Sequence, residues 1–362
     1  MIKIQVRPFP LKLRNPFTLA HGSSSVRENV FIEITMNGCT GYGEGPIVPY
    51  YHNTKEQVID DITETLKGYK EGEIVEMIEK GVTPLFKFST SRAAFDSAAV
   101  NIRSCSMKKS PSEILEVEKT HNFIPSTFTI AYHDDIDKMV SIATSCGFQR
   151  LKIKAGLPGD ITRIKAIREA LPDAQLFVDA NQGWSVNEAH MNLKELEGYN
   201  ITLVEEPIKG SPEEIEEVAK NTSIPIFLDE SIQRMEEVKL YRTKAPHLKG
   251  IVIKSAKIGG PYETKKIIGE ARKHNFLIFL SSMVESSVGI ASVVPFIPMC
   301  DYIDLDGPLL ITNDPFSGLS YEHEQLILSS GGLKPNQEIV KLFSITLGGE
   351  EYGYSNRRNE GE

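Results

Sequence analysis

The spacing of apolar and polar residues changes near residue 125, which divides the chain into two parts. Before that point, strand-like alternation comes first and helical spacing follows. The strand candidates are Ile2–Val6, Asn29–Thr35 and Gly41–Glu44, and the helical segments are Thr54–Glu79 and Ser89–Arg103. Strands followed by helices within about 120 residues predict a separate α+β domain.

After residue 125, short apolar runs alternate with amphipathic helical segments. Eight runs have the length and composition of buried strands: Pro125–Ala131, Arg150–Lys154, Ala174–Asp179, Ile201–Glu205, Pro225–Asp229, Gly250–Lys254, Phe276–Ser281 and Tyr302–Asp306. Strict alternation of eight strands with helices favours a (β/α)8-type barrel over an open sheet.

One polar segment of the first part, Thr18–Ser25, consists of small residues and lies between two strand candidates. Segments of this composition are usually mobile loops, and such loops often cover a binding site. We therefore expect a mobile loop at residues 18–28.

Composition and charge narrow the class of protein. The net charge of −9 argues against binding to nucleic acid, because the phosphates would be repelled. Nowhere do 18 apolar residues follow one another, so no membrane span is expected. The four cysteines are widely spaced, and we interpret them as reduced residues of a cytoplasmic protein.

Ionisable residues stand at the ends of five consecutive predicted barrel strands. Lys154, Asp179, Glu205, Asp229 and Lys254 follow one another at intervals of 25, 26, 24 and 25 residues, about one βα unit each. They would form a ring at the C-terminal face of the barrel, where active sites of this fold lie. Each residue alone is more often structural, but five in register indicate a site.

Lys152 and Lys154 lie two positions apart on one predicted strand, so their side chains face the same way. Two nearby ammonium groups repel, which lowers the pKa of one or both and suits a lysine to act as a base. The alternative is a pair of solvated surface lysines.

The three acidic residues of the ring, Asp179, Glu205 and Asp229, require a cation if all are charged at close range. Oxygen ligands select a hard ion, and Mg²⁺ is the expected one. Alternatively, the three carboxylates pair with lysines or cap helices. A bound metal would stabilise an enediolate formed by loss of an α-proton. Lys154 and Lys254, on opposite sides, would then remove and return that proton, as in racemisation.

The motifs of the barrel strands resemble those of the muconate-lactonizing branch of the enolase superfamily, over nearly the whole chain. The matching strings are Lys152–Lys154 (KIK), Phe177–Trp184 (FVDANQGW), Leu203–Pro207 (LVEEP), Phe227–Ser231 (FLDES) and Val252–Gly260 (VIKSAKIGG). The resemblance implies a modified (β/α)7β barrel over residues 123–319. It also implies an α+β capping domain over residues 1–122, on which residues 320–362 pack back. The implied roles are a magnesium site at the three acidic residues, and acid/base catalysis by Lys154 and Lys254 with Lys152 assisting.

Within this branch, Asp304-Leu305-Asp306 is similar to the Asp-x-Asp of dipeptide epimerases, where it captures the N-terminal amine. Relatives acting on Ala-Glu carry an arginine in the first loop, and the matching position here is Ser24, with Arg27 as a shifted substitute. Ser24 and Thr127 complete the candidate substrate contacts. The alternative for Asp304 and Asp306 is a solvated turn.

These observations predict a Mg²⁺-dependent dipeptide epimerase that inverts the α-carbon of the C-terminal residue and possesses no nucleic-acid or membrane partner. A homo-oligomer is compatible with the sequence. Alternatives within the superfamily are a cycloisomerase, an o-succinylbenzoate synthase or an N-acylamino-acid racemase, whose substrates lack a free amine. Different classes are a Schiff-base aldolase, which needs no metal, and a non-catalytic barrel.

Overall fold

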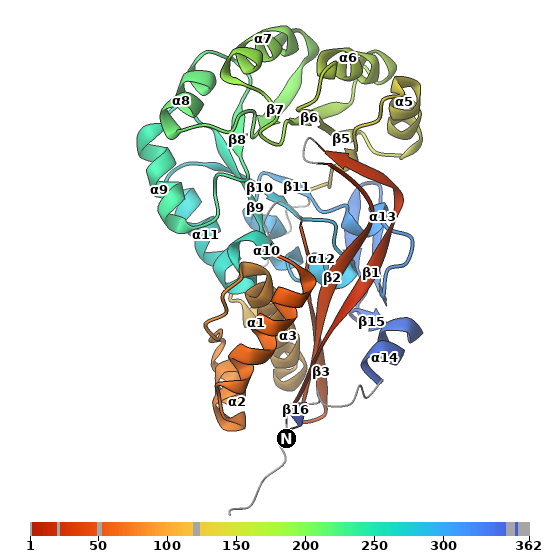
Figure 1. Ribbon diagram of the computed structural model, residues 1–362, viewed down its shortest axis with the longest axis vertical. Coiled ribbons are helices and arrows are strands. Elements are labelled where there is room, and N and C mark those ends of the chain that lie inside the picture. The colour runs from red at the N-terminus through yellow and green to blue at the C-terminus, as the bar shows by residue number, and fades with distance from the viewer. Residues whose placement is uncertain (1, 20–21, 49–52, 119–123, 345–351, 354–362) are drawn as a thin grey trace, which may run out of the picture.

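The computed structural model describes residues 2–19, 22–48, 53–118, 124–344 and 352–353. An antiparallel sheet with three helices forms one end of the molecule and a barrel forms the other (Figure 1). In the described residues the sheet has the order β16-β1-β2-β3. Its strands are β1 (Ile2–Leu19), β2 (Gly22–Met36), β3 (Cys39–Gly45) and β16 (Tyr352–Gly353). The helices beside it are α1 (Lys55–Lys67), α2 (Glu71–Lys80) and α3 (Ser89–Met107). The expected helical segment 54–79 is therefore two helices, and α1 ends at Lys67 with Gly68 as its C-cap.

Three alternating glycines of β3 let α3 lie directly against the sheet. A Cβ atom added at Gly43 would stand 1.9 Å from the carbonyl oxygen of Ala94, and one at Gly41 would stand 2.4 Å from that of Ala98. At Gly45 the added atom would stand 2.8 Å from the side chain of Thr90. The N-terminus of α3 is thereby placed beside the end of β3, on the side of the barrel.

Gly43→Ala is expected to destabilise the protein by about 3 kcal/mol, because the added methyl group must push the backbone of α3 away from the sheet. Gly72→Ala in α2 is the matched control, since an added Cβ there meets nothing within 4 Å. Alanine in that helix should leave stability unchanged or raise it. Urea unfolding of both variants measures the difference. Equal stability of the two variants would contradict this account of the packing.

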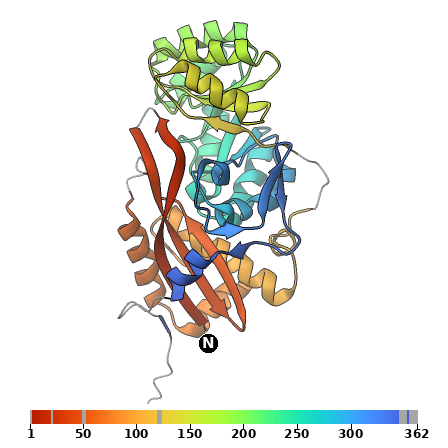
Figure 2. The same cartoon turned by 90° about the vertical axis from the view of Figure 1, so that its right-hand side faces the viewer.

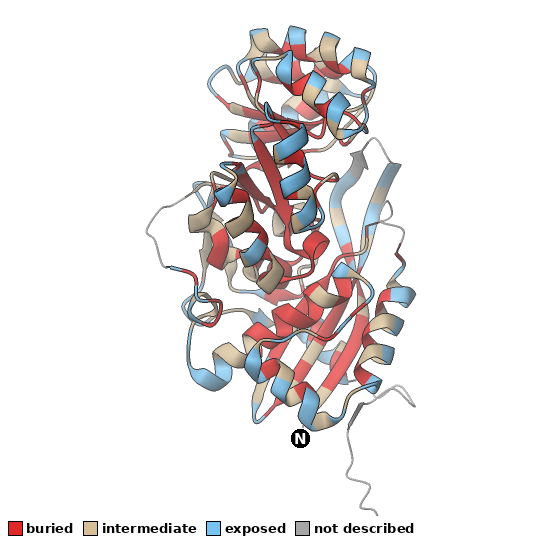
Figure 3. Cartoon of the chain, turned by 90° about the vertical axis from the view of Figure 1, so that its left-hand side faces the viewer, coloured by how far each residue is buried: buried red, intermediate tan, exposed pale blue. Residues whose placement is uncertain are grey.

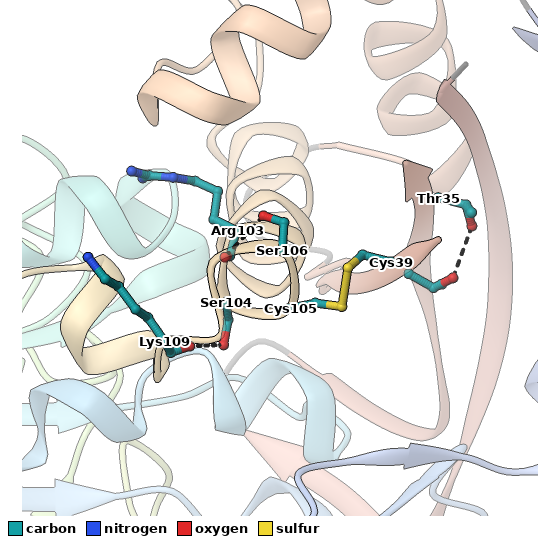
Figure 4. The surroundings of a disulfide bond; sticks show 8 residues. Thr35, Cys39, Arg103, Ser104, Cys105, Ser106 and Lys109 are labelled. Atoms are coloured by element: carbon teal, nitrogen blue, oxygen red, sulfur yellow. Dashed lines mark hydrogen bonds between the residues drawn. A yellow bond between two sulfur atoms is a disulfide. The ribbon is translucent and has the colours of Figure 1, made fainter. Parts of the chain in front are cut away.

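Two of the four cysteines form a disulfide, which corrects the expectation that all are reduced. Cys39 of β3 and Cys105 of α3 are bonded, with their Cα atoms 5.9 Å apart (Figure 4). Their separation of 66 residues in the chain gave no sign of this proximity, which arises from the packing of α3 on β3. Cys146 and Cys300 are free. The cytoplasmic location inferred from reduced cysteines loses that support.

The barrel contains all eight expected strands, which confirms the prediction of a (β/α)-type barrel. In the described residues they follow the order β11-β10-β9-β8-β7-β6-β5-β4, and all pairs are parallel. A parallel bridge between Ser126 and Ile303 joins the first strand to the last. The strands are β4 (Phe128–Ile130), β5 (Arg150–Lys154), β6 (Gln175–Asp179), β7 (Ile201–Glu205), β8 (Ile226–Leu228), β9 (Gly250–Lys254), β10 (Leu277–Ser281) and β11 (Tyr302–Asp304).

Helices follow the strands and surround the barrel (Figure 1). The longer ones are α5 (Ile136–Ser145), α6 (Asp160–Ala170), α7 (Val186–Leu196), α8 (Pro212–Lys220), α9 (Met235–Lys244) and α11 (Pro261–Lys273). The short ones are α10 (Ser255–Ile258), α12 (Ser287–Ala291), α13 (Gly307–Leu310), η2 (Glu197–Tyr199) and η3 (Val294–Met299). Another short helix, α4 (Pro111–Ile114), precedes the first barrel strand. Among the described residues, no helix has the length and apolar character needed to cross a membrane.

Aromatic and aliphatic side chains fill the interior of the barrel below its C-terminal face. The cluster consists of Phe177, Leu203, Phe227, Val252, Phe279 and the partly buried Tyr302. Such layers close the lumen of this fold. The polar side chains two residues further along these strands therefore pack against this apolar layer. Burial there makes each unpaired charge costly.

The segment expected to be a mobile loop belongs instead to a long hairpin. β1 and β2 pair as far as Leu19 and Gly22, with a bulge between Lys12 and Phe17. Residues 20 and 21 lie outside the described residues. Figure 2 shows the hairpin extending from the sheet to the barrel, and residues 22–28 of β2 are exposed or partly exposed (Figure 3). Strand pairing with β1 decides the backbone here, despite the turn-like composition.

The C-terminal part of the chain contacts both units. The hairpin of β13 (Leu319–Glu322) and β14 (Gln325–Leu328) packs on the barrel through Leu319, Tyr321 and Leu326. Helix α14 (Gln337–Ser344) packs on β1 and β2, because Ile339 and Phe343 join the cluster of Phe9 and Phe31. Strand β12 (Phe316–Ser317) precedes the β13–β14 hairpin and β15 (Lys334–Pro335) follows it, and the two strands pair to form a small antiparallel sheet. The domain boundary at residues 122 and 123 falls outside the described residues and stays a prediction.

Candidate active site

The predicted ring of ionisable residues is assembled by the register of the barrel strands. Lys154 pairs with Asp179 across β5 and β6, and Asp179 pairs with Glu205 across β6 and β7. Lys254 ends β9, and Asp229 follows β8 by one residue. All five side chains are buried. The structure thus brings together every member of the ring at the C-terminal face.

Lys152 lies at the centre of the acidic residues. Its Nζ is 2.8 Å from Glu205 Oε2, 3.2 Å from Asp179 Oδ2 and 3.1 Å from Asp304 Oδ2, and it stands 5.4 Å from the ring centroid of Phe279. Burial lowers the pKa of Lys152, but the three carboxylates together raise it well above its ordinary value. Lys152 is therefore not a lysine whose pKa the pairing lowers, because attraction by the carboxylates exceeds repulsion between the lysines.

Lys154 and Lys254 each bind the carboxylate of a neighbouring strand. Lys154 Nζ donates to Asp179 Oδ2 at 2.5 Å, and Lys254 Nζ donates to Asp229 Oδ2. Strands β5 and β9 are four positions apart in the closed order of eight, and so lie on opposite walls of the barrel. Both lysines line one pocket. Two proton-transfer groups can therefore approach one carbon atom from opposite faces.

Asp229 has a second lysine partner. Lys257 Nζ donates to Asp229 Oδ1 at 2.7 Å and to the carbonyl oxygen of Val252 at 3.0 Å. Burial raises the pKa of Asp229, but Lys254 and Lys257 outweigh burial and hold it well below its ordinary range. Asp229 is therefore ionised at neutral pH.

Asp179, Glu205 and Asp229 present carboxylate oxygens from adjacent strands. Oxygen is the type of ligand atom that a hard divalent cation prefers. Glu205 Oε1 is buried without a hydrogen-bond partner. Burial and the charge of Asp179 raise the pKa of Glu205 to about 8, although Lys152 lies 2.8 Å from Glu205 Oε2. A cation at Oε1 would favour the charged form of Glu205. Within the described ranges, however, no three such ligands converge on one point. The lysines pair with the carboxylates, which is the alternative considered above, and the metal site stays a prediction.

A second layer of polar residues supports the acidic ring. Glu206 Oε2 accepts from the backbone of Asp229 at 2.6 Å, and Glu206 Oε1 accepts from Gln182 at 2.9 Å. Asn181 donates to Glu230 Oε1 at 3.1 Å, whereas Asn181 Oδ1 and Glu230 Oε2 are buried without partners. The strand-end pattern did not identify these residues, although the strings around Asp179, Glu205 and Asp229 contain them.

Asp304 and Asp306 point into the same pocket as the two lysines, as expected from their spacing. Asp304 Oδ1 accepts from Thr127 Oγ1 at 2.5 Å, and Asp306 Oδ2 accepts from the backbone of Thr129 at 2.6 Å. Both carboxylates are buried, so they are not a solvated turn. Thr127 is not among the residues lining the pocket; it orients Asp304, and Thr129 lines the wall instead.

Ser24 and Arg27, on β2, differ in their relation to the pocket. Arg27 lines it, whereas Ser24 is not part of its wall. The Ser24 hydroxyl donates to the carbonyl oxygen of Val26 at 2.5 Å. The structure therefore favours Arg27 over Ser24 as the residue of this strand that meets a ligand.

Sequence reasoning missed the segment after β10. Ser282, Met283 and Val284 line the pocket, and their position at a barrel strand end was the available signal. Asn29 Nδ2 donates to the carbonyl oxygen of Val284 at 2.9 Å, and to Glu44 Oε1 at 2.6 Å. Residues of the antiparallel sheet therefore hold one wall of the barrel pocket.

Family models match both parts of the chain. Residues 1–115 match the mandelate racemase/muconate lactonizing enzyme N-terminal domain, and residues 135–315 match the enolase C-terminal domain-like model. The chain is 32% identical to the L-Ala-D/L-Glu epimerase of Bacteroides thetaiotaomicron, over 91% of this chain and 86% of that protein. It is 30% identical to the L-Ala-D/L-amino acid epimerase of Flavobacterium johnsoniae, over 88% and 94%.

The fold is similar to that of the dipeptide epimerase from Cytophaga hutchinsonii, whose crystal structure contains Mg and the dipeptide D-Ala-L-Val. The TM-score is 0.83 at 25% identity, and the similarity covers 94% of this chain and 98% of that one.

Proposed function

The chain belongs to the mandelate racemase/muconate lactonizing enzyme family and is an isomerase acting on amino acid derivatives, and on this premise we propose that it is a Mg²⁺-dependent dipeptide epimerase. The observation that carries the proposal is one pocket lined by Lys154 and Lys254 on opposite walls, together with Asp304 and Asp306. Two lysines on opposite walls are suited to invert one carbon atom, because one can remove a proton and the other can return it to the opposite face. The two buried carboxylates are suited to bind an ammonium group.

The dipeptide would bind with its ammonium group at Asp304 and Asp306 and with its carboxylate toward Lys152 and the acidic ring. The α-carbon of the C-terminal residue then lies between Lys154 and Lys254. One lysine, in its neutral form, takes the α-proton, and the other, in its ammonium form, delivers a proton to the opposite face. Lys152, held by three carboxylates, stays charged and attracts the substrate carboxylate.

Asp179, Glu205 and Asp229 would hold Mg²⁺. When bound, the ion would neutralise the charge that develops on the substrate carboxylate as the α-proton leaves. Lys154 and Lys254 donate to Asp179 and Asp229 in this structure, so ligation would release both ammonium groups toward the substrate.

A cycloisomerase or an acylamino-acid racemase would share the lysines and the acidic ring. Their substrates lack a free amine, and burying Asp304 and Asp306 in the pocket wall would then serve no substrate group. Asp304 already pairs with Lys152, whereas Asp306 accepts a hydrogen bond from the backbone amide of Thr129. A buried carboxylate without a counter-charge is costly, so Asp306 favours a cationic ligand end.

Exchange in D2O tests the proposal. Incubated with Mg²⁺ and a dipeptide library, the enzyme should incorporate one deuterium at the α-carbon of the C-terminal residue, detected by mass spectrometry. Adding EDTA should stop the exchange, and excess Mg²⁺ should restore it. If no dipeptide of the library incorporates deuterium, whether its second residue is acidic, basic or apolar, the proposal is wrong. Exchange that persists in EDTA would overturn the metal requirement alone.

A further inference from the structure

Two buried acidic side chains lie close together where the antiparallel sheet meets the barrel. Glu44 of β3 is 2% exposed, and Glu285, which follows the pocket wall Ser282–Val284, is 5% exposed. Both point at Gly289 of α12, because a Cβ atom added to this glycine would stand 2.4 Å from Glu285 Oε2 and 3.0 Å from Glu44 Oε2. The two carboxyl groups therefore approach each other over this glycine.

Glu44 has the surroundings of an ionised carboxylate. Its Oε1 accepts from Asn29 Nδ2 at 2.6 Å. Its Oε2 accepts from Ser286 Oγ at 2.6 Å, from the Ser286 amide at 3.0 Å and from the Gly289 amide at 3.3 Å. Hydrogen bonds to the charged form of a carboxylate favour that form. Because Asn29 comes from the sheet and the other donors from the start of α12, Glu44 also joins the two units.

Glu285 has the surroundings of a protonated carboxyl group. Its Oε1 accepts from the backbone amide of Met283 at 2.9 Å, and its Oε2 lies on the side of Glu44. Burial raises the pKa of Glu285, and burial together with the charge of Glu285 raises the pKa of Glu44. Two neighbouring carboxylates in a buried place disfavour double ionisation, and such a pair loses its protons in separate steps. Burial and repulsion therefore favour one proton on the pair, and the donors to Glu44 favour its placement on Glu285.

Two further charged groups act on the pair, one of each sign. Lys254 of β9 lowers the pKa of Glu285, but burial outweighs this effect, and the Lys254 ammonium group donates to Asp229. Asp314 adds a negative charge that raises the pKa of Glu44. The cation is thus already paired with another carboxylate, and ionisation of Glu285 would increase the negative charge around Glu44.

The backbone of Glu285 links the pair to the catalytic pocket. It lies against Gly307, because a Cβ atom added there would stand 2.6 Å from the carbonyl oxygen of Glu285 and 2.9 Å from its amide nitrogen. Gly307 directly follows Asp306, the proposed partner of the substrate ammonium group. Asn29, which donates to Glu44, also donates to the carbonyl oxygen of Val284 in the pocket wall, at 2.9 Å. A displacement of Glu285 would therefore shift both the wall and Asp306.

We propose that Glu44 and Glu285 form an acid pair with a single proton, and that this pair positions the wall Ser282–Val284 and Asp306 for substrate binding. Glu285 carries the proton and Glu44 the charge. Neither residue lines the pocket, so both are positioning residues. Loss of the proton at alkaline pH makes the two carboxylates repel each other and moves the wall. The positioning role rests on the proposed dipeptide epimerase function, whereas the pair itself is tested without substrate.

Glu285→Gln tests the acid pair. Glutamine keeps the size of the protonated carboxyl group and can still donate a hydrogen bond, but it cannot lose a proton. A carboxyl group whose pKa is raised in the folded state stabilises the fold less as the pH rises through that pKa. Between pH 6 and 9 the unfolding equilibrium constant, measured in urea, should therefore rise more steeply in the wild type than in Glu285→Gln, by up to about tenfold per pH unit. Glu79→Gln, at an exposed position of α2, is the matched control and should follow the wild type.

The positioning role is measured in KM and kcat, with a dipeptide that exchanges in D2O. At pH 6.5 the KM of Glu285→Gln should lie within about threefold of the wild-type KM, because glutamine replaces the neutral acid. From pH 6.5 to 9 the wild-type KM should rise about tenfold more than that of Glu285→Gln, with kcat less affected. Titration of the substrate amine acts equally on both proteins. Glu44→Gln should raise KM at both pH values, because its NH2 group would meet the hydrogen-bond donors that Glu44 accepts from.

The outcomes separate the acid pair, its positioning role and the proposed function. Equal pH dependence of unfolding in the wild type and Glu285→Gln would overturn the acid pair. Glu285→Met, which cannot titrate either, replaces the glutamine in this measurement if that variant does not fold. If unfolding differs but the KM profiles of the two proteins coincide, the positioning role is wrong. If no dipeptide exchanges, the proposed function is wrong and the positioning role with it, and the unfolding measurement still decides whether the acid pair exists.

Discussion

Lys254→Ala should abolish inversion of the α-carbon while proton exchange survives on one epimer of the substrate. Lys254 and Lys154 stand on opposite walls of the pocket, so each can reach only one face of the carbon. Inversion needs both, because one removes the proton and the other returns it. Removal of either should lower the rate of epimerisation by about 10³-fold or more. The remaining lysine can still take a proton from its own face and return deuterium to the same face.

The measurement is deuterium incorporation into the L,L and L,D forms of one dipeptide, each followed separately. Lys254→Ala should exchange one form without inversion, and Lys154→Ala should exchange the other. The two variants are therefore controls for each other, and Lys165→Ala on the exposed face of α6 controls for loss of a lysine elsewhere. Loss of exchange on both forms in each variant would contradict a division of labour between two bases.

The ring of charged residues could be predicted because it follows from strand spacing alone. Parallel strands with right-handed crossovers bring equivalent strand ends to one face of the barrel. The positions of Lys154, Asp179 and Glu205 could therefore be predicted without knowledge of side-chain packing. The apolar layer of Phe177, Leu203, Phe227, Val252 and Phe279 follows from the same register, because residues two apart on a strand face the same side. The family resemblance assigned the same residues, and the observed register agrees.

Features that depend on contacts between distant segments could not be predicted in the same way. The bond between Cys39 and Cys105 arises where α3 meets β3, and that approach depends on glycines opposite the helix. The paired hairpin also replaced the expected loop, because hydrogen bonding to β1 outweighed local composition. Its register placed Arg27 at the pocket wall, three residues along the chain from Ser24, the position inferred by matching motifs.

The raised pKa of Lys152 has the same origin. Two lysines on one strand suggested repulsion, which is a local interaction visible in the sequence. The larger interaction comes from Glu205 and Asp304, which reach Lys152 from other strands. Local spacing therefore identified Lys152, whereas the direction of its pKa shift depends on carboxylates from other strands.

Asp306→Asn should weaken the use of free dipeptides by about 10- to 100-fold in kcat/KM, and should change the use of N-acetylated dipeptides less than threefold. The carboxylate is 3% exposed and lines the pocket, so an ammonium group bound there is shielded from water. Hydrogen bonds to charged groups contribute about 1.5–3 kcal/mol. The asparagine keeps the acceptor for the Thr129 amide, so only the charge is lost. An equal loss for both substrate types would remove the role in amine capture.

The pH dependence of KM gives an independent measurement on the same residue. Burial and the neighbouring charge of Asp304 raise the pKa of Asp306 to about 7. Below that pH Asp306 gains a proton and loses its attraction for an ammonium group, so the KM of free dipeptides should rise as the pH falls from 7.5 to 6. The dipeptide amine, with a pKa near 8, is more fully charged at the lower pH, so its own titration acts in the opposite direction. Asp306→Asn should remove the rise, and N-acetylated dipeptides should not show it in either protein. A rise of equal size for free and acetylated substrates would place the titrating group elsewhere in the pocket.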